Sequence, residues 1–318
     1  MPDAAIECHD LAKSFGNDSQ ALQGVSFAVV RASVCALLGH NGAGKTTTIN
    51  ILSTLVRPSA GSAFVAGFDV ARQAAQVRAS IGVTGQYAAL DELLTGRENL
   101  LLFAQLRGLR QRAAKQRADE LIQRFDMGHA ADRRVSTYSG GMRRRIDIAV
   151  ALVVPPRVLF LDEPTTGLDP RSRRDVWDLV ASLRRQDVTV LLTTQYLEEA
   201  DVLSDSIVVL DSGRIAASGT ADELKCRVGV SYCQVTPADP VHLPVIATAL
   251  ADFAVSDCEA MIDHQAAAVS VPAPDGVVTF GEVFRRLDGL GIELADISLR
   301  RPSLDEAFLR LTSEAVTV

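Results

Sequence analysis

Short, uninterrupted apolar runs recur along the chain, and such runs are typical of strands buried on both faces of a parallel sheet. The predicted strands span residues 25–30, 34–38, 158–162, 188–194 and 207–210. Helix-forming stretches separate them, and the predicted helices span residues 46–55, 143–154 and 171–185. This alternation predicts an α/β fold.

Two regions depart from the alternation. Residues from about 90 to 127 are nearly all helix-forming, with a helical pattern over 106–125. Beyond Lys225 come short strands, several prolines and a final helix, in which Ser303 and Glu306 form a capping box. The apolar face of that helix is formed by Leu304, Ala307, Phe308 and Leu311. We therefore predict a first domain over 1–224 and a small α+β accessory domain over 225–318.

Composition narrows the functional class. The chain has 318 residues, 47% of them hydrophobic, and a net charge of −7. Most of that negative charge lies beyond residue 224, which argues against nonspecific nucleic-acid binding because that requires a basic surface. No apolar run approaches 18 residues, and the N-terminus has no signal-peptide pattern, so we expect a soluble chain. The five cysteines show no C-x-x-C spacing and are interpreted as reduced thiols.

A phosphate-binding loop follows the strand predicted at 34–38. Residues 39–46 read Gly-His-Asn-Gly-Ala-Gly-Lys-Thr and fit the pattern G-x-x-x-x-G-K-[ST]. Glycines allow backbone N–H groups to surround phosphate oxygens, and the following helix adds the partial positive charge of its N-terminus. We expect Lys45 to reach the β- and γ-phosphates of a nucleotide, and the Thr46 hydroxyl to bind Mg²⁺.

Two carboxylates close the strand predicted at 158–162. Asp162 and Glu163 stand at its carboxyl end, where ligands gather in parallel sheets. We expect Asp162 to hold Mg²⁺ through water and Glu163 to act as the general base toward the attacking water. The alternative is that the two acids merely cap a helix.

A second candidate anion site opens the helix predicted near 143. Ser139 resembles an N-cap, and Gly140 and Gly141 leave the free N–H groups of the helix start accessible.

Taken in order, these motifs resemble the ATP-binding cassette (ABC) ATPases over roughly residues 4–224. The resemblance implies a P-loop ABC ATPase fold with a mixed sheet core and a helical subdomain at about 88–155, which the helix-forming stretch over 90–127 suits. The resemblance implies that Ser139-Gly140-Gly141 contacts the γ-phosphate bound to the opposite subunit. It also matches Gln86 to the Q-loop, Gly167-Leu168-Asp169 to the D-loop and Gln195 to the switch position. The implied nucleotide contacts are Phe15, Gly39, Asn41, Gly42, Ala43, Gly44, Lys45, Thr46, Thr47, Ser139, Gly140, Gly141 and Asp169. The implied metal site comprises Thr46, Gln86 and Asp162, and the implied catalytic residues are Glu163, Gln195 and Gln86.

Several positions depart from the family pattern. Gln195 replaces the usual histidine, and its amide can donate a hydrogen bond to a phosphate oxygen but cannot become cationic; alternatively it only caps its strand. Met142 replaces the glutamine that usually ends the signature, and His40 stands at what we interpret as a variable position. Phe15 aligns with an aromatic that stacks on adenine, and the alternative is a core-facing strand residue.

Longer stretches resemble the ATPase subunits of daunorubicin-resistance drug and lipid exporters. They are Val83-Thr84-Gly85-Gln86 and the segments 138–145, 193–200 and 301–308. This resemblance implies an ATP-hydrolysing homodimer with two ATP and Mg²⁺ at its interface, peripheral at the cytoplasmic face of the cell membrane. It would energise efflux of a lipophilic small molecule bound by a separate transmembrane permease, with no nucleic-acid partner. The alternatives are a soluble ABC ATPase acting on nucleic acid or the ribosome, and an importer ATPase.

Overall fold

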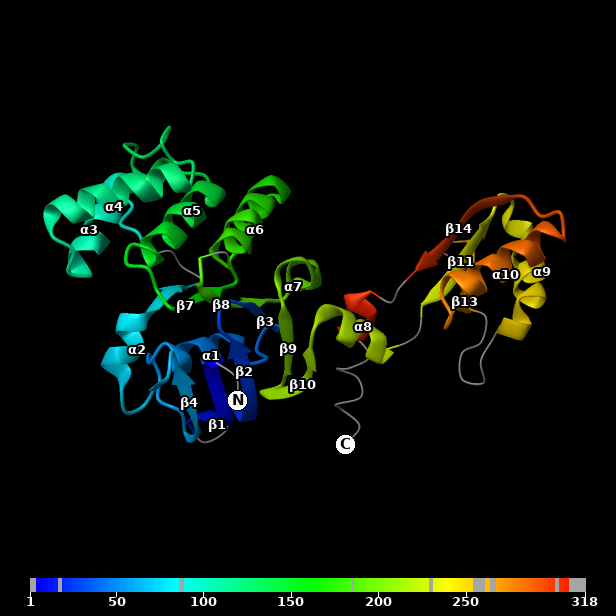
Figure 1. The fold of residues 1–318 in the computed structure, drawn as a ribbon, viewed down its shortest axis with the longest axis horizontal. Helices are drawn as coiled ribbons and strands as arrows, with labels where there is room; N and C mark the ends of the chain where they lie inside the picture. The colour runs from blue at the N-terminus through cyan, green and yellow to red at the C-terminus, as the bar shows by residue number, and fades with distance from the viewer. Residues whose placement is uncertain are drawn as a thin grey trace. The chain divides into compact units, whose positions relative to one another are not determined.

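The computed structural model describes residues 4–16, 19–85, 89–184, 186–228, 231–253, 261–263, 267–300 and 303–308. The chain forms two compact units, Met1–Ala221 and Asp222–Val318. Figure 1 shows the helices and strands of both units, coloured from blue at the N-terminus to red at the C-terminus.

The first unit is built on a six-stranded sheet in the order β10-β9-β3-β8-β7-β6. Its parallel strands are β3 (Val34–Leu38), β6 (Ile81–Thr84), β7 (Val158–Asp162), β8 (Thr189–Thr194) and β9 (Ser206–Asp211), and β10 (Arg214–Gly219) is antiparallel to β9. Every residue of β3, β7 and β8 is buried, as uninterrupted apolar strands require. Because β8 lies between β3 and β7, the carboxyl ends of these three strands are neighbours.

An antiparallel sheet in the order β2-β1-β4-β5 completes the strands of this unit. Its members are β1 (Ala4–Phe15), β2 (Ser19–Val30), β4 (Ala60–Val65) and β5 (Phe68–Asp69). Helix α1 (Lys45–Leu52) contacts β2, β4 and β7. One hydrophobic cluster joins α1 to both sheets, with Leu11, Leu37, Ile49 and Phe160 among its buried members. The sequence-based prediction of an α/β fold with a mixed sheet is confirmed.

The remaining helices of the first unit are α2 (Ala74–Ser80), α3 (Gly96–Leu106), α4 (Gln111–Arg124), α5 (Gly140–Ala151), α6 (Pro170–Arg184) and α7 (Leu197–Leu203), with a 3-10 turn over Val135–Thr137. In Figure 1, α3, α4 and α5 lie together, away from the antiparallel sheet. Helix α3 starts with a capping box: the Thr95 hydroxyl accepts from the Glu98 N–H at 3.1 Å, and the Glu98 carboxylate accepts from the Thr95 N–H at 2.8 Å.

The helical pattern over 106–125 is not one helix, contrary to the sequence-based prediction. Helix α3 ends at Leu106 and α4 begins at Gln111. Gly108 adopts a left-handed φ of +87°. Its N–H donates to the Gln105 carbonyl and the Leu109 N–H to the Ala104 carbonyl, both at 2.9 Å. This pair of bonds is a Schellman ending, which glycine favours because it has no Cβ.

The second unit has its own four-stranded antiparallel sheet in the order β12-β13-β11-β14. Its elements are α8 (Ala221–Val228), β11 (Tyr232–Pro237), α9 (Leu243–Ala249), β12 (Met261–Asp263), β13 (Ala268–Pro272), α10 (Val277–Asp288) and β14 (Leu294–Arg300), with 3-10 turns over Pro240–His242 and Ala251–Phe253. A separate hydrophobic core includes Cys233, Val235, Ile246, Val283 and Leu287. The predicted α+β character of this region is therefore present.

The predicted capping box near the C-terminus is confirmed. The Glu306 N–H donates to the Ser303 hydroxyl at 3.1 Å, and the Glu306 carboxylate accepts from the Ser303 N–H at 3.2 Å. Leu304 and Ala307 are buried within the chain, whereas Leu311 lies outside the described residues. Among the helices that the structure describes, each is too short or too polar to cross a membrane.

Candidate phosphate-binding site

The loop between β3 and α1 has the backbone geometry that its glycines permit. Gly42 and Gly44 adopt left-handed φ values of +87° and +106°, and Gly44 is the N-cap of α1. A Cβ on Gly44 would lie 2.7 Å from the Ala21 carbonyl oxygen, and one on Gly39 would lie 2.3 Å from the Leu210 carbonyl oxygen. Side chains are therefore excluded at both positions, and the loop backbone packs closely on β2 and β9.

Lys45, the first residue of α1, is folded back over this loop. Its side chain is only 5% exposed, and Nζ donates to the carbonyls of Gly39 at 2.7 Å and His40 at 3.0 Å. Glu163 Oε1 lies 3.7 Å from the same Nζ. Burial lowers the pKa of Lys45, and the carboxylates of Glu163 and Asp162 act in the opposite direction. An ammonium group is thus held where the loop would place phosphate oxygens.

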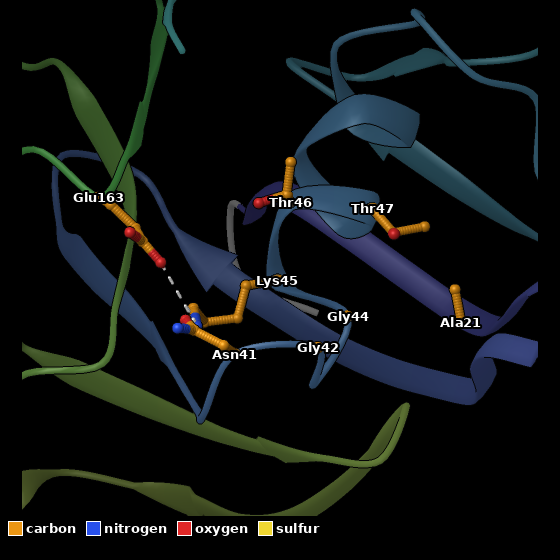
Figure 2. A pocket seen from close by; sticks show the side chains of 8 residues that line it. All are labelled: Ala21, Asn41, Gly42, Gly44, Lys45, Thr46, Thr47 and Glu163. Carbon is orange, nitrogen blue, oxygen red and sulfur yellow. Dashed lines mark ion pairs between the residues drawn. The ribbon is translucent and has the colours of Figure 1, made fainter. Parts of the chain in front are cut away.

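A cavity of ≈ 310 Å³ opens beside the loop (Figure 2). Its lining is Ala21, Asn41, Gly42, Gly44, Lys45, Thr46, Thr47 and Glu163. Lys45 and Glu163 point toward one another in Figure 2, while Thr47 and Ala21 lie on the opposite side of the loop. The volume is at the lower end of the range for small-molecule sites, about 300–1,000 Å³.

Asp162 and Thr46 bring oxygen atoms together at the end of β7. The Thr46 hydroxyl lies 3.4 Å from Asp162 Oδ1, which also accepts a short hydrogen bond from the Thr193 hydroxyl on β8. Asp162 is only 3% exposed. Hydroxyl and carboxylate oxygens are the ligands that Mg²⁺ prefers. The residues present therefore fit the predicted divalent cation.

Glu163 adopts an unusual backbone conformation. Its φ is +47°, a left-handed value that costs a residue other than glycine about 1–3 kcal/mol. Its N–H donates to the Thr193 carbonyl at 3.2 Å and hydroxyl at 3.0 Å, and its carboxylate accepts from the Thr166 hydroxyl at 3.2 Å. Neither Asp162 nor Glu163 caps a helix, because α6 begins only at Pro170. The strained backbone aims the carboxylate at the cavity.

The Ser139-Gly140-Gly141 segment forms the start of α5, which begins at Gly140 rather than near 143 as the sequence pattern suggested. The reason is the Ser139 cap, whose hydroxyl accepts from the Met142 N–H at 3.3 Å, so that helical geometry starts within the glycines. Ser139 and Gly140 are exposed. A Cβ on Gly141 would lie 2.4 Å from the Ser172 hydroxyl of α6. Within the described part of the chain, these three residues do not line the cavity that contains Lys45.

Asp169 caps the N-terminus of α6. Its carboxylate accepts from the N–H groups of Arg171 and Ser172, both at 3.0 Å, and from the Ser172 hydroxyl at 2.6 Å. These bonds, with Ser172 contributing most, lower the pKa of Asp169. The side chain is exposed, so it remains accessible to a second molecule while its orientation is fixed.

The other predicted site residues occupy separate positions. Gln195 directly follows β8 and is half-buried. Phe15 ends β1 and is 46% exposed, with Lys13 Nζ 4.9 Å from the centroid of its ring, so it is not a core residue. Ala43 is buried in the loop, and its carbonyl accepts from the Gly213 N–H at 3.1 Å. Gln86 lies outside the described residues.

Several residues of this region were not predicted from the sequence. The Thr193 hydroxyl donates to Asp162, and it also accepts from the Glu163 N–H. Thr193 lies one residue before the end of β8, and this position beside the end of β7 is the sequence feature that could have indicated its role. His40 Nε2 lies 2.9 Å from Asp211 Oδ1 and its Nδ1 lies 2.7 Å from the Asn41 carbonyl. Both contacts raise the pKa of His40, and the contact with the Asn41 carbonyl has the larger effect.

A buried carboxyl links the segments that follow β7 and β8. Glu199 on α7 is fully buried, and its Oε1 accepts from the Thr165 hydroxyl at 2.9 Å and from the Trp177 indole N–H at 3.2 Å. Burial raises the pKa of Glu199. Thr165 lies two residues after Glu163, and α7 begins two residues after Gln195.

The arrangement combines the elements of phosphoryl chemistry in one place. It offers backbone N–H groups at a helix start, a buried ammonium, an oxygen site suited to a divalent cation and a carboxylate facing the cavity. These are the groups that P-loop nucleotidases use to bind a triphosphate and polarise water.

Comparison with known proteins agrees with this chemistry. Residues 22–166 match the ABC transporter family. The chain is 54% identical over 313 residues to the doxorubicin resistance ATP-binding protein DrrA of Mycobacterium tuberculosis, covering 98% of this chain and 95% of the relative. It is 51% identical to the daunorubicin resistance ATP-binding protein DrrA2 of Streptomyces coeruleorubidus, covering 98% and 96% of the two chains.

Among solved structures, cbiO1 of Clostridium perfringens, part of an ABC transporter complex, superposes with a TM-score of 0.65 at 26% identity over 70% of this chain and 91% of that one. Fold, site chemistry and near-full-length identity lead to one conclusion. The chain belongs to the ABC transporter ATPases, in the group of daunorubicin- and doxorubicin-resistance ATP-binding proteins.

Proposed function

We propose that this ATPase energises the efflux of a drug or other lipophilic compound through a separate membrane-spanning permease. The observation that carries the ATPase activity in this proposal is the ion pair of Lys45 and Glu163, whose Nζ and Oε1 atoms lie 3.7 Å apart in the lining of the cavity beside the phosphate loop. Relatives of nearly the same length are named for resistance to doxorubicin and daunorubicin. No feature of the described residues favours a nucleic-acid, ribosomal or import function over this one.

In this proposal Lys45 leaves the carbonyls of Gly39 and His40 and binds the β- and γ-phosphates of ATP. The loop N–H groups of residues 39–44 surround the phosphates, with Asn41 and Thr47 at the rim, and Phe15 stacks on adenine. Thr46, Asp162 and Gln86 would hold Mg²⁺, which when bound neutralises phosphate charge. The close approach of the Thr46 hydroxyl and Asp162 carboxylate supports this assignment.

Glu163 acts as the general base. Its carboxylate accepts a proton from a water molecule while the water oxygen forms a bond to the γ-phosphorus. The bond from that phosphorus to the β,γ-bridging oxygen breaks, and ADP and inorganic phosphate result. Gln195 donates an amide N–H to a γ-phosphate oxygen, where charge accumulates. The left-handed backbone at residue 163 supports a functional placement of this side chain, because such strain is concentrated at active sites.

We propose further that two copies of the chain sandwich two ATP molecules. Ser139, Gly140 and Gly141 of one copy would contact the γ-phosphate bound by the other, with Asp169 at the same interface. Support comes from the exposed start of α5, which offers N–H groups but does not line the chain's own cavity. Closing and reopening of this dimer would convert hydrolysis into motion of the permease.

The proposed location is the cytoplasmic face of the cell membrane, with the ATPase bound peripherally to its permease and with residues 225–318 serving assembly. The acidic charge of that region argues against nucleic acid as the partner.

The test is co-expression of this chain with a candidate membrane-spanning permease, followed by measurement of ATP-dependent doxorubicin transport into inverted membrane vesicles. We expect transport by the wild-type pair, and none when Lys45→Ala removes the phosphate contact. The ATPase should be found in the membrane fraction only with its partner. Vesicles that transport doxorubicin equally with wild-type and Lys45→Ala protein would contradict the proposal.

A further inference from the structure

We propose that Arg144 is a positioning residue for hydrolysis, which holds the backbone on both sides of Glu163 in the conformation that aims its carboxylate at the cavity. This inference rests on the proposed role of Glu163 as general base. Arg144 belongs to α5, whose first residues form the proposed second anion site, and its side chain is only 10% exposed.

The contacts of Arg144 converge on the residue pair that flanks Glu163. Its Nη2 donates to the Asp162 carbonyl at 3.0 Å, and its Nε donates to the Pro164 carbonyl at 2.9 Å. One guanidinium therefore binds the carbonyl before and the carbonyl after Glu163. A third bond, from Nη1 to the Gly85 carbonyl at 3.0 Å, connects the same group to the end of β6.

Glu163 needs such a restraint because its φ of +47° is unfavourable for a residue with a Cβ. A strained backbone persists only where its surroundings determine it. Thr193 fixes the Glu163 N–H, and Arg144 fixes the two adjacent carbonyls. Without Arg144, the carbonyls of Asp162 and Pro164 lose their buried donors, and rotation at residue 163 would move the carboxylate away from the cavity.

The planar shape of the guanidinium suits this task. Arginine carries five N–H donors in a fixed fork, whereas lysine has a compact ammonium on a flexible stem. Asp147, which is 4% exposed, accepts from Arg144 Nη1 at 3.1 Å and balances its buried charge. Asp147 also accepts from the backbone N–H of Ala89. The fork is thus oriented from one side and bonded to three carbonyls on the other.

A purely structural role, in which Arg144 only attaches α5 to the core, makes a different prediction. The chain offers a matched arginine for that role. Arg117 on α4 also binds two backbone carbonyls, those of Leu152 and Val153 at 2.9 and 3.1 Å, at the far end of α5. Loss of either fork should affect thermal stability, but only loss of the Arg144 fork should affect the rate of the chemical step.

The experiment compares Arg144→Lys with Arg117→Lys in the full-length chain, measuring kcat, nucleotide affinity and melting temperature. We expect Arg144→Lys to lower kcat about 10-fold or more, because small misplacements of a catalytic group cost rates of this order. Its affinity for ATP should stay within about 3-fold of wild type. Arg117→Lys should keep kcat within about 2-fold. A kcat of Arg144→Lys within about 2-fold of wild type would overturn the inference.

A second arm combines Arg144→Lys with Glu163→Gln under single-turnover conditions. If Arg144 acts through Glu163, the double variant should be no more than about 2-fold slower than Glu163→Gln alone. A full repeat of the Arg144→Lys loss in that background would contradict the inference. Failure of the proposed function has its own signature, since Glu163→Gln by itself would then hydrolyse ATP at the wild-type rate.

Should Arg144→Lys not fold, Arg144→Gln with Asp147→Asn provides the same test. Removing both members of a buried ion pair is less destabilising than removing one. The same loss of kcat with retained ATP affinity is expected, and wild-type kcat would overturn the inference.

Discussion

Glutamine at position 163 would keep the shape of the side chain, and its amide oxygen could still accept the 3.2 Å hydrogen bond from the Thr166 hydroxyl. The substitution removes the negative charge and the ability to accept a proton from water. Loss of a positioned general base lowers turnover by about 10²–10⁴-fold. That range corresponds to an increase of about 3–5 kcal/mol in the activation free energy.

The affinity of Glu163→Gln for ATP should increase, although its turnover falls. Lys45 Nζ and Glu163 Oε1 are separated by 3.7 Å, with side chains 5% and 11% exposed. At an effective dielectric constant of about 20, their attraction amounts to roughly 4 kcal/mol. Most of this is offset by the cost of burying both charges. If breaking the Lys45–Glu163 ion pair costs a net free energy of about 1 kcal/mol before Lys45 can bind phosphate, Glu163→Gln, which lacks this pair, should bind ATP about 5-fold more tightly.

The assay measures ATP affinity by fluorescence titration, hydrolysis by single-turnover kinetics, and assembly by gel filtration with Mg²⁺ and ATP. We expect Glu163→Gln to accumulate as an ATP-bound dimer while the wild type returns to monomer. Wild-type hydrolysis by the variant would refute the assignment of Glu163 as base. An affinity weaker than wild type would refute the reasoning about Lys45.

Three further variants test other groups. Between pH 8 and pH 6, the hydrolysis rate of the wild type, with Gln195 at the switch position, should fall less than that of Gln195→His, because the new imidazole titrates near pH 6.5. Superimposable pH–rate profiles, together with a fully active Gln195→Ala, would exclude contact of residue 195 with the phosphate. The raised pKa of His40 means that its contribution to stability is complete below about pH 6.5 and is lost as the pH rises through the folded-state pKa. Between pH 6 and pH 8, the free energy of unfolding in urea should therefore fall less for His40→Gln than for wild type. The difference should be under about 1 kcal/mol, because the His40 side chain is 51% exposed. Equal losses in the two proteins would contradict this. Leu304 is 4% exposed, so Leu304→Ala should destabilise its unit by about 3 kcal/mol in thermal unfolding. Phe308 is half-buried, so Phe308→Ala should destabilise the unit by less. An unchanged melting temperature for Leu304→Ala would show that the burial of this side chain is not energetically significant.

The strands that carry the site were predictable because each is buried on both faces. β3 and β7 have the bounds that their apolar runs indicate, and β8 starts one residue later than its run. Helix boundaries were less predictable. Gly108 ends α3 inside a pattern that otherwise indicates one helix, because a single left-handed residue outweighs the propensities of its neighbours.

The arginines after the signature glycines show why the site was only partly predictable. Arg143, Arg144 and Arg145 are alike in the sequence, but each residue of a helix points about 100° away from the previous one. Arg143 forms an ion pair with Glu92 at 3.0 Å and Arg145 forms one with Asp175. Only Arg144 reaches the backbone around Glu163. Its partners are main-chain carbonyls, which leave no pattern of residue types in a sequence.

The hydrogen bond between Trp177 and Glu199 gives the protein an intrinsic spectroscopic probe. Trp177 is the only tryptophan in the chain, and it is 9% exposed. Its indole N–H donates to the carboxyl that also binds Thr165, so one fluorophore contacts the group joining the segments after β7 and β8. Indole emission depends on local polarity and on nearby quenching groups. Stopped-flow fluorescence of the unlabelled protein can therefore time the rearrangement of both segments when ATP is added, without the introduction of a dye.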